Sequence, residues 1–264
     1  MARTRIGRGA IVDAIAHALG PLDRVHAVWE GGAASRGTLD EWSDIDISVD
    51  ADDGAAATVF AAVERALGKL SGIELAYRVP LPPSHDYAQR FYRVRDASRF
   101  ALVDLAVFRH SAGDKFLNPV LHGMPVFIMT RGGSPTELRW SRRAFAKAMR
   151  ARLDRLRARY AMFACFVEKE LARGNSIEAL WHYQRVLLDT LLEVLRMRYG
   201  PAHYGFGVRY VHQELPAPVV RRFERLAFVK DEADLRRKSR AATRWLDDSI
   251  ARIDLRDVER RLGA

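Results

Sequence analysis

The fold assignment rests on one stretch, Glu30-Gly31-Gly32-Ala33-Ala34-Ser35-Arg36-Gly37-Thr38-Leu39-Asp40-Glu41-Trp42-Ser43-Asp44-Ile45-Asp46-Ile47. Its end alternates between Asp and Ile. Because residues i and i+2 of a β-strand point to the same side, Asp44 and Asp46 should share one face and Ile45 and Ile47 the other, toward a core. Two adjacent carboxylates raise each other's pKa unless a cation lies between them. The spacing therefore predicts an oxygen site for Mg²⁺, which prefers such hard ligands.

Two glycines, Gly31 and Gly32, directly follow the segment 25–30 (VHAVWE), which is expected to be a strand. A glycine turn lets backbone N–H groups approach a phosphate closely, and a short helix starting at Ala33 would add its positive end. The glycines precede the Asp pair by about twelve residues. A phosphate cradle and a metal-binding carboxylate pair are the two halves of a nucleoside triphosphate site.

A third carboxylate, Asp104, lies in the apolar segment 100–108 (FALVDLAVF), where an unpaired charge would be costly. The neighbours Val103, Leu105 and Val107 share one face of this predicted strand, and Asp104 takes the other. If this segment pairs beside the strand that holds the Asp pair, the three carboxylates converge on one or two metal ions.

The sequence changes in character near residues 132–135. Before this point, strands are predicted at 25–30, 44–49, 73–79, 89–94, 100–108 and 125–130, with helices at 6–19 and 55–69. After it, helices are predicted at 136–172, 176–198, 217–229 and 233–262, the first capped by Ser134 or Thr136. The pattern predicts an α+β fold, with a mixed-sheet domain over residues 1–133 and an all-helical bundle over residues 134–264.

Together, the paired glycines, the Ser-Asp-Ile-Asp-Ile run (43–47) and the later Asp104 resemble the nucleotidyltransferase superfamily of DNA polymerase β. Within it, the chain looks most like the small antibiotic nucleotidyltransferases, which adenylylate aminoglycosides and lincosamides and carry a helical domain after the catalytic one. The resemblance implies that 1–133 is a nucleotidyltransferase catalytic domain. It also implies that 134–264 forms part of an acceptor cleft.

The resemblance also implies roles for particular residues. Asp44, Asp46 and Asp104 would be the catalytic carboxylates and would hold Mg²⁺, as two ions, with Asp104 the candidate general base. The nucleotide, expected to be ATP, would be bound by Gly31, Gly32, Ala33, Arg36 and Ser43. Family members often have Ser directly after the glycines, where this chain has Ala33; Ser35 comes two residues later and is not clearly equivalent. A phosphate-binding hydroxyl is therefore expected to be missing.

Charge is distributed unevenly along the chain, whose formal net charge is +10. Residues 1–133 carry a net charge of −1, whereas residues 134–264 carry 28 basic and 17 acidic side chains, a net charge of +11. Solvated helix faces would account for this excess. If the second half forms one wall of the acceptor site, it should repel a polycation. A small-molecule hydroxyl acceptor that is neutral or anionic is therefore expected, in spite of the likeness to aminoglycoside-modifying enzymes.

Two other functions remain open. The basic second half would suit nucleotide addition to an RNA end, or antitoxin-like modification of a partner protein, although no clear platform of basic and aromatic residues marks a single-strand binder. A non-catalytic nucleotide-binding module is the other alternative, and the three aspartates argue against it. The sequence leaves the acceptor, the preferred base and the oligomeric state undetermined.

Composition adds expectations about location. No apolar run approaches the ~18 residues that a membrane span needs, and the early apolar stretch is broken by Asp13 and His17, against a signal peptide. A cytoplasmic protein without membrane partners is expected. The single cysteine, Cys165, lies in the apolar run AMFACFV and is predicted to be a small core residue.

Overall fold

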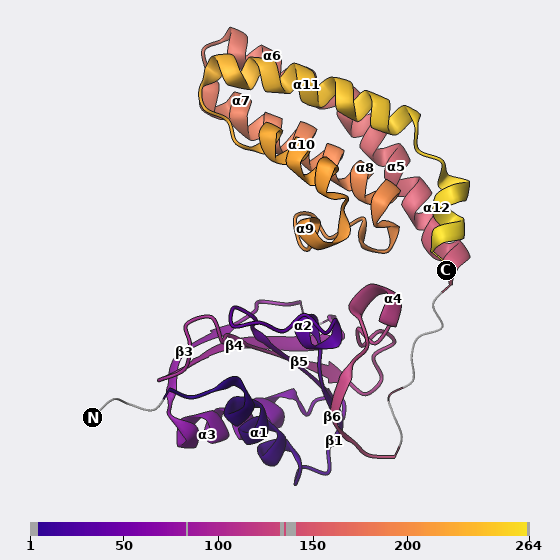
Figure 1. Cartoon of the computed structure of the whole chain (residues 1–264). Helices are drawn as coiled ribbons and strands as arrows, with labels where there is room; N and C mark the ends of the chain where they lie inside the picture. Colours follow the sequence, from indigo (N-terminus) through magenta and orange to yellow (C-terminus); the bar gives the residue numbers. More distant parts are fainter. Residues whose placement is uncertain (1–4, 83, 133–134, 136–140, 263–264) are drawn as a thin grey trace. The chain divides into compact units, whose positions relative to one another are not determined.

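The computed structural model describes residues 5–82, 84–132, 135 and 141–262. The chain forms two compact units, Met1–Trp140 and Ser141–Ala264, the first built on a mixed six-stranded sheet and the second on helices (Figure 1). The fold is therefore α+β, as the sequence predicts. The expected boundary between residues 133 and 134 lies outside the described residues.

The sheet of the first unit has the order β3-β4-β5-β2-β1-β6. Strands β2 and β5 run parallel to each other, and the other neighbouring pairs are antiparallel. The strands are β1 (Val25–Glu30), β2 (Ile45–Ala51), β3 (Ile73–Arg78), β4 (Tyr87–Val94), β5 (Val103–Arg109) and β6 (Val126–Thr130). The six predicted strands are confirmed to within a few residues, except that β2 begins at Ile45, so Asp44 lies just before the strand.

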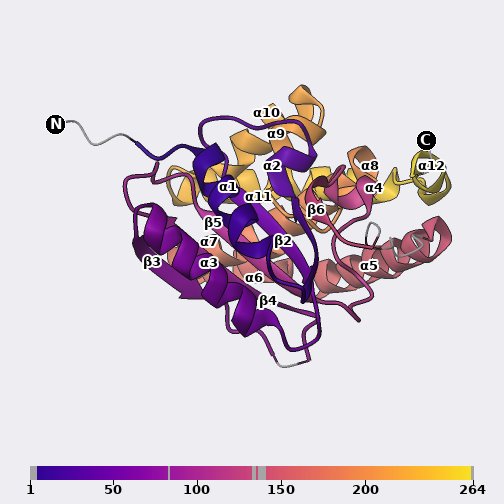
Figure 2. The same ribbon diagram turned by 90° about the horizontal axis from the view of Figure 1, so that it is seen from below.

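Helices α1 (Arg8–Leu19) and α3 (Ala56–Leu70) cover one face of this sheet, as Figures 1 and 2 show from two sides. Alternate residues of β2 and β5 meet them in a buried core. Its members include Ile11, Ile15, Ile45, Ile47, Val49, Val59, Val63, Leu67, Val103, Leu105 and Val107. The predicted inward faces of both strands are thereby confirmed, and strand alternation directs Asp46 and Asp104 to the opposite side.

That opposite side carries a smaller apolar cluster of Ala27, Trp29, Ala106, Phe108 and Leu117. Two short helices belong to this part of the unit, α2 (Gly32–Ser35) and α4 (Pro119–His122). The β2 residue Asp50 is buried here, and its carboxylate lies 3.1 Å from His110 Nδ1 and 3.3 Å from Lys115 Nζ. These partners offset the cost of removing a charge from water.

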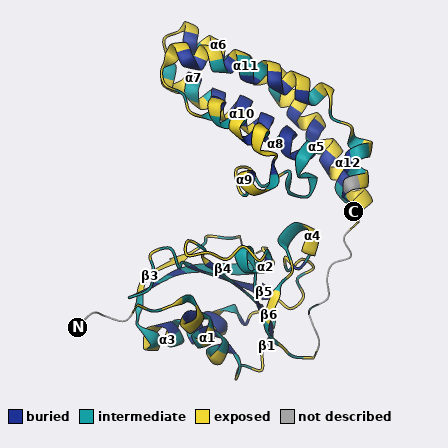
Figure 3. Cartoon of the chain, viewed as in Figure 1, coloured by how far each residue is buried: buried dark blue, intermediate teal, exposed yellow. Residues whose placement is uncertain are grey.

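The second unit is a helical bundle, and buried and exposed residues are interspersed along its longer helices (Figure 3). Its elements are α5 (Arg142–Phe163), α6 (Cys165–Ala172), α7 (Ser176–His182), a π-helical stretch (Tyr183–Leu188), α8 (Asp189–Tyr199), a 3₁₀ turn (Pro201–His203), α9 (Val211–Glu214), α10 (Ala217–Ala227), α11 (Glu232–Ala251) and α12 (Leu255–Arg261). The predicted helix 176–198 is confirmed as the continuous run α7 to α8, with the π-helical stretch inside it.

Two predicted helices differ from the structure. The caps expected at Ser134 or Thr136 lie outside the described residues, and α5 is capped instead by Ser141, whose Oγ accepts a hydrogen bond from Ala144 N at 3.2 Å. The single helix predicted over 233–262 is wrong, because Asp254 leaves the helical conformation and caps α12 by accepting from Arg256 N at 2.9 Å.

Cys165 is exposed, so its prediction as a core residue is wrong. The buried positions of α6 are Val167 and Leu171, which are four residues apart and therefore lie on one face of the helix. That arrangement leaves Cys165 on the outer side. An apolar run cannot by itself show which of its members faces inward.

A buried arginine, Arg196 of α8, holds the irregular segment 200–210 together. Its guanidinium donates to Gly207 O at 2.7 Å and to the Glu214 carboxylate at 2.6 Å, and it also donates to Arg209 O.

No helix within the described residues is long and apolar enough to cross a membrane.

Candidate functional site

The predicted carboxylates come together at the start of the two parallel strands. Asp46 of β2 is the direct register partner of Asp104 of β5, and Asp44 immediately precedes β2. Asp46 and Asp104 are half-buried, whereas Asp44 is exposed. Burial, together with the nearby negative charges of Asp44 and Asp104, raises the pKa of Asp46 to about 7. The three side chains therefore interact electrostatically, as the alternating sequence predicts.

Both glycines contact Asp46. The Gly31 N–H donates to Asp46 O at 3.0 Å. Gly32 has φ +52°, and a Cβ placed on it would lie 1.8 Å from Asp46 Oδ2. Position 32 therefore requires glycine, both because of its backbone conformation and because the Asp46 carboxylate approaches it closely. Helix α2 begins at Gly32, one residue before the predicted start at Ala33.

The polar side chains near the glycines mostly stabilise the loops. Ser35 is buried, and its Oγ lies 2.9 Å from Gly32 O and 2.6 Å from His122 O. Arg36 Nη2 donates to Leu121 O at 3.2 Å. These bonds join α2 to the segment around α4. Gly123, at the end of α4, also packs closely against α2, since a Cβ there would lie 2.6 Å from Ser35 O.

Ser43 contributes to the loop before β2. Its Oγ donates to Asp40 Oδ1 at 2.7 Å and accepts from Asp40 N at 3.0 Å. Accordingly, the pKa of Asp40 is lowered, chiefly by this side-chain hydrogen bond. The structure thus places Ser43 directly before the carboxylates but engages its hydroxyl within the loop.

Two residues of the site were missed by sequence reasoning. Gln89 of β4 donates through Nε2 to both Asp104 oxygens, at 2.7 and 2.9 Å. Arg8, at the start of α1, donates to Asp44 O and to the Glu30 carboxylate. Gln89 carried a weak signal, as a polar residue in a predicted strand, but its partner depends on a strand register that the sequence does not contain. Arg8 carried no signal.

The donor chemistry of the site fits a hard divalent cation, because three carboxylates share a small region and the charge of Asp46 is unfavourable without one. As they stand, however, no three Asp, Glu, His or Cys side chains within the described part of the chain are arranged to hold a metal ion. Gln89 occupies both oxygens of Asp104, and Asp44 is exposed. Coordination by all three aspartates therefore requires rotation of their side chains.

Comparison with known proteins gives little beyond this geometry. No family model matches the chain, and no curated protein does. The chain is similar to a solved structure of an aminoglycoside 6-adenyltransferase from Bacillus subtilis, with 14% sequence identity and a TM-score of 0.31, over 97% of this chain and 94% of that one. A likeness of this size carries no argument about activity.

The close contact between Gly32 and Asp46 predicts that Gly32→Ala will displace the Asp46 carboxylate and lower the melting temperature. The matched control is Gly37→Ala, because Gly37 also has a positive φ (+67°) but no atom within 4 Å of a Cβ there. Both variants carry the backbone strain, roughly 1–2 kcal/mol, and only the first adds a collision. Thermal unfolding should show a clearly larger loss for Gly32→Ala; equal losses would contradict the close approach.

The raised pKa of Asp46 predicts a pH-dependent effect of Asp46→Asn in metal-free protein. Between pH 4 and pH 7, roughly, the folded state holds a proton on Asp46 that the unfolded state has lost, so stability falls as pH rises through this window. Asn cannot ionise, so Asp46→Asn should raise the melting temperature in EDTA at pH 8 more than at pH 5.

The control for this measurement is Asp23→Asn, at a fully exposed carboxylate. Its melting temperature should follow that of the unsubstituted protein across the same pH range. A stability difference between Asp46→Asn and the unsubstituted protein that does not change with pH would show that Asp46 has an ordinary pKa.

Proposed function

We propose that this protein is a Mg²⁺-dependent nucleotidyltransferase that transfers a nucleoside monophosphate, with AMP the expected group, from a nucleoside triphosphate to a hydroxyl of a small molecule. One observation carries the proposal: Asp46 and Asp104 are register partners on neighbouring parallel strands, and the glycine turn at the start of α2 packs against Asp46. The carboxylates and the glycine turn thus lie side by side.

In this proposal Asp44, Asp46 and Asp104 hold the metal, and the triphosphate supplies further ligands. When bound, Mg²⁺ would neutralise the carboxylates and stabilise negative charge on the phosphate oxygens. The first N–H groups of a helix lack partners within the helix, so Gly32 and Ala33 would supply donors at the start of α2, while the Gly31 N–H is bonded to Asp46 O. The family resemblance implies that Arg36 and Ser43 bind the nucleotide. To do so, they would have to exchange their present hydrogen bonds to Leu121 and Asp40 for bonds to the nucleotide.

The proposed transfer is a nucleophilic displacement at the α-phosphorus of the nucleoside triphosphate. The acceptor oxygen forms a bond to the α-phosphorus, the bond from that phosphorus to the bridging oxygen breaks, and pyrophosphate leaves with the electron pair. The hydroxyl proton passes to a base, for which Asp104 is the candidate. Gln89 donates to both Asp104 oxygens, each of which keeps a further lone pair, so Asp104 can still accept a proton.

The acceptor is proposed to be neutral or anionic. The helical unit carries most of the positive charge, since residues 134–264 have a net charge of +11. Long-range repulsion from a unit of this charge slows the approach of a polycation and weakens its binding. The proposed acceptor is therefore not a polycationic aminoglycoside, despite the sequence resemblance to enzymes that modify aminoglycosides.

The test is incorporation of label from α-³²P-ATP with Mg²⁺ into candidate acceptors. Asp46→Ala and Asp104→Ala should each lower turnover by about 100-fold or more, because each removes a proposed metal ligand, whereas Asp23→Asn should not. Near-native turnover in either alanine variant would reject the assignment. Nucleotide binding without any metal-dependent transfer would indicate a non-catalytic module, and label in RNA ends or in protein would indicate the macromolecular alternatives.

The acceptor set should include an aminoglycoside and its fully N-acetylated, neutral derivative, which share one hydroxyl skeleton. The neutral compound should be the better acceptor, and the difference should shrink as salt is raised, because ionic strength screens the repulsion. Efficient labelling of the free aminoglycoside, undiminished at low ionic strength, would show that charge does not select the acceptor.

A further inference from the structure

The face of the sheet that carries the aspartates continues past Asp104 onto β4 and β3. In the strand register, Asp104 of β5 is the partner of Phe91 on β4, and Phe91 is the partner of Tyr77 on β3. On its other side, Asp104 is the partner of Asp46. Register partners point to the same side of a sheet, so these four side chains form one row across four neighbouring strands.

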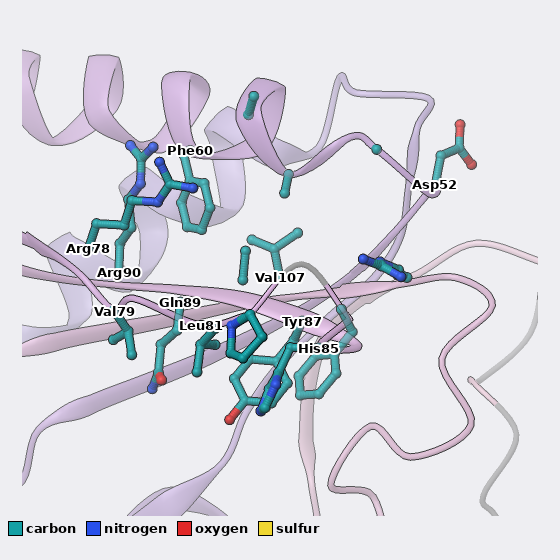
Figure 4. Close-up of a pocket in the computed structure, with 17 residues that line it drawn as sticks. Asp52, Phe60, Arg78, Val79, Leu81, His85, Tyr87, Gln89, Arg90 and Val107 are labelled. Atoms are coloured by element: carbon teal, nitrogen blue, oxygen red, sulfur yellow. The ribbon is translucent and has the colours of Figure 1, made fainter.

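The neighbouring residues of β3 and β4 agree with this direction. Figure 4 shows that Arg78 and Arg90 point toward α3, whereas Gln89 points to the opposite side of the sheet. Phe91 directly follows Arg90, and Tyr77 directly precedes Arg78. Because side chains alternate along a strand, Phe91 and Tyr77 face away from α3, on the side of the aspartates.

Tyr77 and Phe91, with Leu75 beside them, form an accessible apolar surface that we call the aromatic shelf. Tyr77 and Leu75 are 56% and 57% exposed, although both belong to a regular strand. The centroids of the Tyr77 and Phe91 rings are 6.5 Å apart, and the rings are tilted by 31° to each other. Two neighbouring rings of this kind offer a surface against which another flat apolar ring packs well.

The charges beside the aromatic shelf offset each other. Arg93 lies two residues after Phe91 on the same side of β4, and its Nε is 4.0 Å from the Glu74 carboxylate. The shelf therefore attracts neither an anion nor a cation strongly, and its rings favour a neutral apolar group.

The place of the aromatic shelf in the row assigns it to the acceptor, a step that rests on the proposed nucleotidyl transfer. The Gly31 N–H bonds to Asp46 O, so the glycine turn and the shelf lie on opposite sides of the carboxylates. In a displacement at phosphorus, the entering and leaving oxygens are roughly in line. If pyrophosphate leaves at the glycine turn, the acceptor enters from the side of Asp104 and the shelf.

We propose that the aromatic shelf binds the body of the acceptor, a neutral alcohol whose hydroxyl lies next to a flat apolar ring. Neighbouring strands are about 4.8 Å apart, so a ring on Phe91 and Tyr77 lies roughly 5–10 Å from Asp104 along the row. A fused two-ring compound with a hydroxymethyl group is long enough to span this distance. Its hydroxyl would reach Asp104, while Tyr77 and Phe91 position the ring and take no part in the chemistry.

The binding experiment titrates 2-naphthalenemethanol into the protein in EDTA and follows saturation-transfer difference NMR, with myo-inositol as an alcohol that lacks a flat apolar ring. The naphthyl compound should bind saturably and inositol should not. Tyr77→Thr keeps a residue that strands favour, and it should weaken binding by a factor of roughly three to ten through loss of the ring contact. Tyr77→Phe keeps the ring and should bind within about twofold of the unsubstituted protein.

Phe127→Thr is the matched control at a second position. Phe127 is also an exposed ring on an edge strand, but it belongs to β6, at the opposite edge of the sheet. This variant should bind the naphthyl compound as the unsubstituted protein does. Because Tyr77 is exposed, Tyr77→Thr should leave the melting temperature nearly unchanged, which a thermal scan checks.

The transfer experiment measures labelling of 2-naphthalenemethanol from α-³²P-ATP with Mg²⁺. Tyr77→Thr should raise KM by about the factor found for binding and leave kcat nearly unchanged. The reason is that the shelf holds the acceptor body equally well before and during the reaction.

Lack of saturable binding, or equal affinity in Tyr77→Thr and the unsubstituted protein, would overturn the proposal. Binding that is lost in Phe127→Thr but kept in Tyr77→Thr would place the ring at the other edge of the sheet and would also overturn it. Labelling of acceptors with an unchanged KM in Tyr77→Thr would overturn the acceptor role of the shelf but not the transfer. Binding that depends on Tyr77, without labelling of any acceptor, would support the ring site and overturn nucleotidyl transfer.

Discussion

The parallel pairing of β2 with β5 is the constraint on which the rest of the site depends. It places Asp46 beside Asp104, and each strand buries its alternate residues so that both carboxylates emerge on the same side of the sheet. Burial, together with the nearby negative charges of Asp44 and Asp104, raises the pKa of Asp46 to about 7. The pairing therefore leaves Asp46 easier to protonate than an ordinary aspartate.

The surroundings of the carboxylates hold the backbone in place around this unfavourable charge. Gly32 allows the turn to touch Asp46, and Ser35 and Arg36 tie α2 to the segment around α4. Gln89 donates to Asp104, and Arg8 joins the Asp44 backbone to Glu30. The glycine turn and the backbone around the carboxylates are therefore held from several parts of the chain.

Much of the first unit could be predicted from local pattern, because alternation in a strand follows from the backbone alone. The buried Ile45 and Ile47, and the outward Asp46 and Asp104, are the direct result. Gln89 and Arg8 could not be predicted as site residues, since their contacts depend on strand register and on how a distant helix packs. The same limit applies to Cys165, whose apolar neighbours did not reveal that it faces outward.

We propose that Asp44, Asp46 and Asp104 together form a divalent cation site. The most direct test is Mn²⁺ binding followed by electron paramagnetic resonance, in the presence of a non-hydrolysable ATP analogue, for the unsubstituted protein and for Asp46→Asn, Asp104→Asn and the exposed control Asp23→Asn. Binding should be saturable in the unsubstituted protein, strongly weakened in the first two variants and unchanged in the third. Binding that is absent from the unsubstituted protein, or that is unaffected by both substitutions, would overturn the assignment of the cation site.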